Sequence, residues 1–238
     1  MKKITLLREL EKYPVFTLKT FMGIIKKESA YSKLYLHRLK EEGLVFKIEK
    51  NKYTTHRDPM LIASNITWPS YLSSWTALRY HNLTEQLPHD IFVITTRSRK
   101  NRVIEFMGTK IFFKRVNPKY FFGYGKEIYG KFNIFVAEAE KALVDCALFK
   151  MVSFSEISDI IKEHVDIIDK KKMFQYCLKS GNMALIKRFG FLLDALGEDF
   201  SKIAFNLNSN LTSNYTLLDT SLSGQGTKNK KWRLIENA

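Results

Sequence analysis

Residues 29–54, SAYSKLYLHRLKEEGLVFKIEKNKYT, decide the fold of the N-terminal part of this chain. The first half has the apolar spacing of a helix that is capped by Ser29, and Gly43 ends it where a left-handed backbone is easiest. The second half alternates apolar and polar residues about the charged turn EKNK, which predicts a β-hairpin. Asn51 in this turn tolerates the positive φ that a tight hairpin needs. A buried helix needs no basic hairpin after it, so we expect its target outside the protein.

Two shorter helices are predicted before this stretch. Residues 4–13 have apolar positions at helical spacing, and Pro14 stops that helix. Residues 17–28 form the second, which begins from a Thr17 cap. Three helices followed by a hairpin predict a winged helix-turn-helix domain over residues 1–56.

The third helix has one face for packing and one face for contact with DNA. Leu36 and Leu39 share the packing face, and the opposite face is free to enter the major groove. There Arg can bond guanine edges, Lys and His can reach phosphate or purine N7, and an exposed Leu can touch a thymine methyl group. Lysines of the hairpin would reach flanking phosphates. The predicted DNA-binding residues are Ala30, Tyr31, Lys33, Leu34, His37, Arg38, Lys47, Lys50, Asn51 and Lys52. The alternative is a three-helix protein-interaction module with solvated lysines.

The charge of the chain favours a polyanionic partner. The formal net charge is +15, and residues 1–54 hold 13 Lys and Arg against 6 Asp and Glu. The alternative is a generally basic surface. A second basic stretch, RSRKNR at residues 97–102, either extends the DNA footprint or is a solvated turn.

The remainder, residues 57–238, is predicted to be a larger α+β domain. Residues 57–150 are strand-rich, with helices at each end and a short antiparallel sheet between them. The glycines of FGYGKEIYG, residues 122–130, are expected in turns. Residues 151–205 have helical patterns, and residues 206–238 are a polar tail. Two apolar islands, YTLLD and WRLI, predict that this tail is docked on the domain through short strands.

No catalytic, cofactor-binding or metal-binding residue is predicted. Cys146 and Cys177 lie in apolar helical patterns, which indicates buried free thiols, and the histidines are scattered without metal-ligand spacing. A metal-dependent nuclease is the enzymatic alternative, because FNIFVAEAEKALVD ends an apolar strand with acids beside Lys141. Glu138 and Glu140 do not have the spacing from Lys141 that a restriction-type site needs, and they suit the start of a helix. No apolar run of membrane-spanning length or signal peptide is seen, so a cytoplasmic location is expected.

The chain resembles the AbiEi family of antitoxins and transcriptional regulators in type IV toxin-antitoxin systems of abortive phage defence. Four stretches carry the resemblance. They are the winged-helix segment with Leu36, Leu39, Gly43 and Tyr53; YLSSWTALRYHNL at residues 71–83; EKALVD at residues 140–145; and RFGFLLDALG with LLDTSLSGQGTKNKKWRLIEN at residues 188–197 and 217–237. The sequence departs from the family pattern at Asn51, Asn82 and Ala139.

The resemblance implies a two-part protein without catalytic activity. The winged helix would bind inverted repeats in its own promoter and repress the operon, as a homodimer or as monomers that bind cooperatively. The larger part would counter a cognate nucleotidyltransferase-like toxin. Duplex DNA and that toxin are therefore the expected partners, and neither a cofactor nor a membrane is expected.

Overall fold

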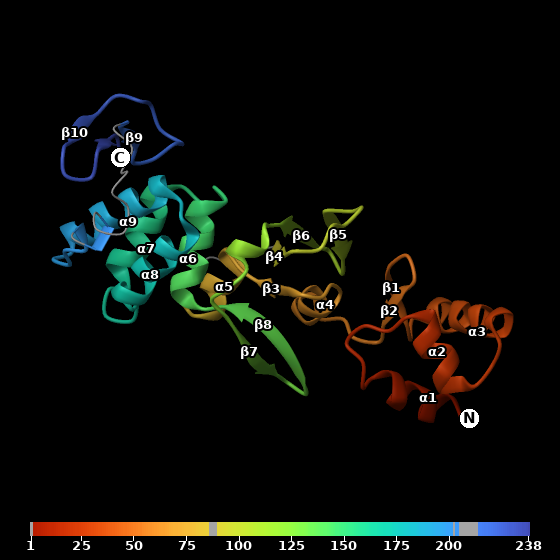
Figure 1. Cartoon of the computed structure of the whole chain (residues 1–238). Coiled ribbons are helices and arrows are strands. Elements are labelled where there is room, and N and C mark those ends of the chain that lie inside the picture. The colour runs from red at the N-terminus through yellow and green to blue at the C-terminus, as the bar shows by residue number, and fades with distance from the viewer. Residues whose placement is uncertain (1, 86–89, 202, 205–213) are drawn as a thin grey trace. The chain divides into compact units, whose positions relative to one another are not determined.

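A computed structural model describes residues 2–85, 90–201, 203–204 and 214–238, and its fold is mixed α+β, as predicted. The chain divides into two compact units (Figure 1). Unit 1 comprises Met1–Leu72, Pro88–Phe121 and Lys126–Val136, and unit 2 comprises Ser73–Leu87, Phe122–Gly125 and Ala137–Ala238. The first 56 residues therefore share a unit with most of the strand-rich segment.

Unit 1 begins with the three helices and the hairpin that the sequence predicts. The helices are α1 (Lys3–Leu10), α2 (Leu18–Ile25) and α3 (Ser29–Glu41), and the hairpin pairs β1 (Phe46–Glu49) antiparallel with β2 (Lys52–Thr54). One apolar core joins them, made of the buried side chains Leu6, Leu10, Phe16, Phe21, Leu36, Leu39 and Val45. This core accounts for one face of α3 and leaves the other uncovered within the helical part.

Local signals at the ends of these helices agree with the sequence in three places and differ in one. The Thr17 hydroxyl accepts a hydrogen bond from the Thr20 amide at 3.2 Å, so Thr17 caps α2 as predicted. Gly43 and Asn51 have φ angles of 68° and 60°, which confirms the left-handed helix end and hairpin turn. The Ser29 cap was wrong, because Glu28 is the N-cap of α3 and no side chain caps it.

The rest of unit 1 is formed by α4 (Pro59–Asn65) and by most of a six-stranded sheet, against which α4 packs. Its order is β5-β6-β4-β3-β8-β7, with β3 (Ser70–Leu72), β4 (Ile91–Thr95), β5 (Val103–Phe106), β6 (Thr109–Arg115), β7 (Tyr124–Tyr129) and β8 (Phe132–Ala137). The short 3₁₀ helix η1 (Pro118–Tyr120) follows β6. The predicted antiparallel pairing is confirmed for β3 with β4 and for β5 with β6, but the sheet as a whole is mixed, because β4 pairs parallel with β6 and β3 parallel with β8. Alternation reports which residues share a face of a sheet, and it does not report the direction of the neighbouring strand.

Buried side chains lie in register across three strands of this sheet. Ile91, Ile111 and Ile104 lie in register across β4, β6 and β5, and all three are buried. The glycine-rich segment at residues 122–130 holds more than turns, because β7 runs through it. Its glycines at 123 and 130 flank the strand with φ angles of 70° and 61°, so these two do make the expected turns.

Unit 2 is mainly helical, as predicted for the segment after residue 150. It contains α5 (Trp75–Tyr80), α6 (Ala139–Leu148), α7 (Phe154–Glu163), α8 (Lys170–Ser180) and α9 (Met183–Ala195). Cys146 and Cys177 are fully buried free thiols, which confirms the sequence prediction. Burial raises the pKa of Cys146 to about 12, so this thiol is protonated and inert at neutral pH.

The C-terminal tail is docked on unit 2, also as predicted. The YTLLD island contains β9 (Thr216–Leu217) and the WRLI island contains β11 (Leu234–Glu236), which pairs with both β9 and β10 (Thr227–Asn229). Trp232 is fully buried, and its indole N–H donates to a carboxylate oxygen of Asp194 in α9 at 3.2 Å. Gly190 lets this ring approach, since a Cβ atom there would lie 2.3 Å from it. Residues 206–213 of the predicted tail lie outside the described part of the chain.

Candidate nucleic-acid interface

The uncovered face of α3 carries every residue of this helix that the sequence assigns to DNA. Ala30, Tyr31, Lys33, Leu34, His37 and Arg38 are all exposed, with Tyr31 at 49% and Leu34 at 52%. The opposite face, with Ser32, Leu36 and Leu39, is buried. Two large apolar side chains on one helix face are exposed to water in the free protein, and their burial against a partner would be favourable.

A groove lies between α3 and the hairpin. Its volume is about 190 Å³, and Lys33, Leu36, His37, Lys40, Lys47 and Tyr53 line it. The helix contributes Lys33, His37 and Lys40, which are four and three residues apart and therefore share one edge of α3. Lys47 faces them from β1. No carboxylate lines this groove, but a Glu41 oxygen lies 3.2 Å from the Lys40 amine and 3.5 Å from His37 Nδ1. Lys33 and Lys47 therefore supply most of the positive charge that favours an anionic partner.

The tip of the hairpin has one free lysine and two residues with structural contacts. Lys50 is exposed, whereas the side-chain oxygen of Asn51 accepts a hydrogen bond from the Leu18 amide at 3.1 Å. Lys52 is partly buried, because its Nζ atom donates to the Ile66 carbonyl at 2.6 Å and lies 2.8 Å from a Glu49 carboxylate oxygen. Asn51 and Lys52 thus hold the hairpin in place, and Lys47 and Lys50 are the hairpin residues open to a ligand.

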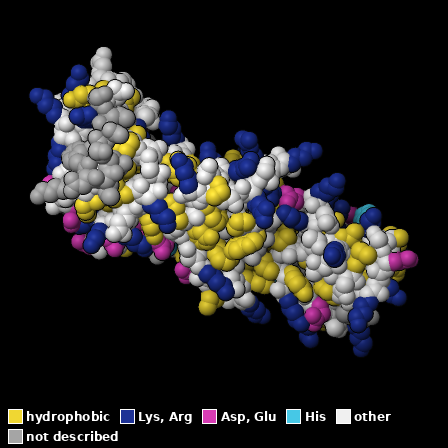
Figure 2. Space-filling model, in the orientation of Figure 1, with side chains coloured by type: hydrophobic (Ala, Val, Ile, Leu, Met, Phe, Trp, Pro, Cys, Tyr) yellow, Lys and Arg dark blue, Asp and Glu magenta, His cyan; other side chains and the backbone are white. Residues whose placement is uncertain are grey.

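The second basic stretch is joined to the hairpin. The Arg99 guanidinium bonds a Glu49 oxygen at 2.6 Å, also bonds the Thr67 hydroxyl, and lies 4.0 Å over the Phe113 ring. Arg97, Arg102 and Arg115 line a small cavity of about 50 Å³ beside it. Arg99 is thereby structural, and Arg97, Arg102 and Arg115 place further positive charge beside it. In Figure 2, Lys and Arg side chains project from the surface of the region that holds α1–α3 and the hairpin.

Sequence reasoning missed Lys40 and Arg115. Lys40 lies on the border of the packing face of α3, and its position seven residues after Lys33 was the available signal. Arg115 ends β6, and only the parallel pairing of β6 with β4 places it opposite Thr95, near residues 97–102. No sequence pattern reports that pairing.

The acids and the lysine of the nuclease alternative lie in unit 2 and do not converge. Lys141 is 1% exposed and forms an ion pair with Asp145, which also accepts a hydrogen bond from Ser73 at 2.9 Å. Burial lowers the pKa of Lys141, and Asp145 opposes this effect. Glu138 and Glu140 instead lie 3.1 and 3.2 Å from the Lys172 amine. Glu138 is the N-cap of α6 and Glu140 lies in its first turn, which agrees with the helix-start interpretation.

A search for metal sites and membrane spans covers the part of the chain that the structure describes. Among residues 2–85, 90–201, 203–204 and 214–238, no three His, Cys, Asp or Glu side chains are grouped to hold a metal ion. Over the same ranges, no helix is both long and apolar enough to cross a membrane. Comparison of the sequence with models of known protein families and with curated proteins finds no match, so the assignment of function rests on the residues and geometry described above.

Proposed function

We propose that this protein is a sequence-specific, DNA-binding transcriptional repressor and that residues 1–56 act as its winged helix-turn-helix. The observation that carries the proposal is the groove between α3 and the hairpin, which Lys33, His37 and Lys40 line from one side and Lys47 from the other. A helix with an exposed cationic face fits the major groove of duplex DNA, and a neighbouring basic hairpin fits the adjoining phosphates.

The roles of individual residues follow from their places on α3. Arg38 and Leu34 lie on the exposed centre of the helix face, where a guanidinium can bond a guanine edge and an apolar side chain can touch a thymine methyl group. Lys33 and His37 lie at the edge that adjoins the hairpin, within the groove. Lys47 and Lys50 contact the phosphate backbone and position the helix without reading sequence. Arg97, Arg102 and Arg115 contact further phosphates of the DNA backbone, next to those that the hairpin contacts.

The larger remainder of the chain acts, in this proposal, as the antitoxin part. Its support is the resemblance to the AbiEi family, which implies a type IV antitoxin that represses its own operon and counters a nucleotidyltransferase-like toxin in phage defence. The buried Lys141–Asp145 pair and the docked tail are packing features, so the residues that carry the resemblance stabilise this part. Neither activity needs a catalytic group from this chain.

Binding of the purified protein to labelled duplexes tests the proposal. Fluorescence anisotropy should show tight binding to the DNA immediately upstream of its own gene and much weaker binding to a scrambled duplex of equal length. Specific sites are typically bound about 10³-fold or more tightly than non-specific DNA at physiological salt. Equal affinity for the two duplexes would refute sequence-specific repression.

The same duplexes separate the repressor from two other functions. Incubation with Mg²⁺ or Mn²⁺ should leave the DNA uncut, and cleavage would instead support the nuclease. Structured RNA should compete poorly, because the deep and narrow major groove of A-form RNA does not admit a recognition helix. For the antitoxin part, co-expression with the product of a neighbouring nucleotidyltransferase-like gene should restore growth that the toxin alone arrests.

A further inference from the structure

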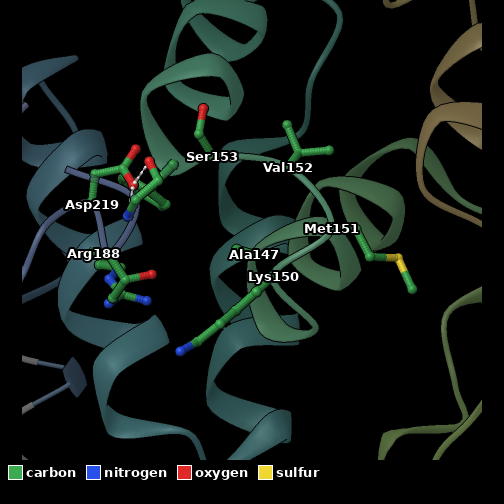
Figure 3. A pocket seen from close by; sticks show the side chains of 10 residues that line it. Ala147, Lys150, Met151, Val152, Ser153, Arg188 and Asp219 are labelled. Carbon is green, nitrogen blue, oxygen red and sulfur yellow. Dashed lines mark hydrogen bonds between the residues drawn. The ribbon is translucent and has the colours of Figure 1, made fainter.

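A cavity in unit 2 is lined by two cationic side chains, Lys150 and Arg188. Its volume is about 330 Å³, and it lies among the end of α6, the start of α7, α9 and the docked tail (Figure 3). The lining residues are Ala147, Lys150, Met151, Val152, Ser153, Phe154, Arg188, Asp219, Thr220 and Ser221. This volume is at the lower end of the range for small-molecule sites in proteins.

Arg188 is the buried cation of this cavity. Its side chain comes from α9, it is 8% exposed, and its Nε atom donates to the Leu217 carbonyl at 2.9 Å. Within the described residues, that is the one hydrogen bond of this guanidinium, so both terminal nitrogens remain open to the cavity. Burial lowers the pKa of Arg188, and the nearby Asp219 raises it. Among the described residues, neither terminal nitrogen is a buried atom without a partner, so both are accessible from the cavity and can donate to an acceptor that enters it.

Asp219 does not accept a hydrogen bond from Arg188, because both of its carboxylate oxygens already accept hydrogen bonds from other residues. One oxygen accepts from the amide and hydroxyl of Ser155, each at 2.8 Å, and the other accepts from the amide and hydroxyl of Ser221 at 2.8 and 2.5 Å. A carboxylate has about four acceptor positions, and these four donors occupy them. Asp219 therefore attaches the tail to α7 and leaves the donors of Arg188 available.

Other donors line the same cavity, and no second carboxylate does. Lys150 is exposed and, in the view of Figure 3, extends from the end of α6 in the direction of Arg188. Ser153 accepts a capping hydrogen bond from the Glu156 amide at 3.2 Å, so its own proton can be donated, and Thr220 adds another hydroxyl. Met151, Val152 and Phe154 give the cavity an apolar wall.

We propose that this cavity binds the phosphoryl group of a small phosphorylated molecule, whose apolar part rests on Met151, Val152 and Phe154. The Arg188 fork bonds two phosphoryl oxygens, and Lys150 neutralises the second charge. The two cations exceed the one lining carboxylate, Asp219, so the cavity keeps a net positive charge. Phosphate is favoured over carboxylate because a phosphoryl group has three terminal oxygens to accept from these cations and from the two hydroxyl donors. This site is independent of the proposed DNA interface, since all its residues belong to unit 2.

Calorimetric titration of the full chain with phenyl phosphate tests the site, with inorganic phosphate, benzoate and sodium chloride at matched ionic strength as comparisons. The expected result is one phenyl phosphate bound per chain, more tightly than inorganic phosphate or benzoate. Lys150→Gly should weaken binding by about tenfold or more, because it removes a charge-assisted hydrogen bond. Lys150 has a φ of 54°, which glycine adopts without strain, so this variant should stay folded.

Lys171→Ala is the matched control, because Lys171 is an exposed lysine of α8 that does not line the cavity. It should bind phenyl phosphate like the wild type. Arg188→Met should abolish binding. If circular dichroism shows that this variant is unfolded, the affinities of Lys150→Gly and Thr220→Val for phenyl phosphate test the site in its place. Absence of phenyl phosphate binding, or equal losses of affinity in Lys150→Gly and Lys171→Ala, would overturn the site. Benzoate bound as tightly as phenyl phosphate would overturn the assignment to phosphate.

Discussion

Phe16 and Tyr53 exchange two backbone hydrogen bonds, at 2.8 and 2.9 Å, and their rings stack at 6.1 Å. This pairing joins the hairpin to the segment that leads into α2. The bond between Asn51 and the Leu18 amide joins the hairpin tip to the same helix. The hairpin and α3 are thus held in one arrangement before any ligand arrives, which lowers the entropy cost of binding.

Asn51 should be the most sensitive residue of the hairpin tip. Asn51→Ala removes the acceptor for the Leu18 amide and retains a left-handed backbone at φ 60°, so we expect a loss of roughly 1–2 kcal/mol in the free energy of unfolding. Asn51→Gly relieves the backbone strain and should lose less. Urea denaturation of both variants measures the difference. A more stable Asn51→Ala variant would show that the bond is unimportant.

The hairpin lysines should differ in their effect on DNA binding. Lys47→Ala and Lys50→Ala each remove one exposed cation, so the slope of log K against log salt should become shallower by about 0.9 for each phosphate that the lysine neutralises. Sequence preference should not change. Lys52→Ala is the control, because Lys52 is already bonded to the Ile66 carbonyl and Glu49, and its replacement should lower stability more than the salt slope. Identical salt slopes in all three variants would show that Lys47 and Lys50 do not contact DNA phosphates.

The buried ion pair of unit 2 should be essential for its stability. Lys141→Met leaves the Asp145 carboxylate without its cation in the core, which typically costs about 3–5 kcal/mol. Adding Asp145→Leu removes the stranded charge and should recover part of that loss. A double-mutant cycle by urea denaturation measures the coupling. Loss of less than about 1 kcal/mol in Lys141→Met would contradict a structural role for the pair.

Asp219 should make the stability of unit 2 depend on acidity. Burial raises the pKa of this carboxyl, but the hydrogen bonds from Ser221 and Ser155 outweigh burial and lower it from 3.8 to about 2. The charged form therefore contributes stability above the unfolded pKa, and this contribution is lost as pH falls from about 4 to about 2. We expect Asp219→Asn to be less stable than the wild type at pH 6 by roughly 2 kcal/mol and nearly equal to it at pH 2. A difference that is constant with pH would contradict this linkage.

Helix and hairpin patterns predicted the elements of the first 56 residues, because each pattern reflects short-range physics. Thr17 and Gly43 occupy the positions that their capping chemistry predicts, and the exposed and buried faces of α3 follow from its 3.6-residue period. Ser29 was misplaced because Glu28 takes the N-cap and Ser32 donates to the Glu28 carbonyl at 2.7 Å. Boundaries of this kind depend on a single side-chain rotamer, which periodicity does not report.

The pairing of strands that are distant in the sequence could not be predicted from local patterns. The parallel alignment of β4 with β6 brings Arg115 to the second basic stretch, and no local pattern encodes it. Lys52 is a cation at the hairpin tip and was therefore predicted to contact phosphate, but its amine donates to the Ile66 carbonyl instead. In the sequence, Arg188 is likewise one more cation in a helical pattern. Only the position of the docked tail shows that its side chain bonds the Leu217 carbonyl and lines a cavity.

The affinity of a double variant for its operator tests the central claim most directly. Lys33→Ala with Arg38→Ala removes two exposed cations from the face of α3, and Arg8→Ala with Lys12→Ala removes the same charge from α1 and the turn after it as a control. Anisotropy titrations at fixed salt should show that the affinity of the α3 variant for the operator falls to that for non-specific DNA, about 10³-fold weaker or more, with circular dichroism unchanged. The α1 variant should retain nearly full affinity. If the α3 variant binds the operator as tightly as the wild type does, α3 is not the recognition helix and the proposed interface is wrong.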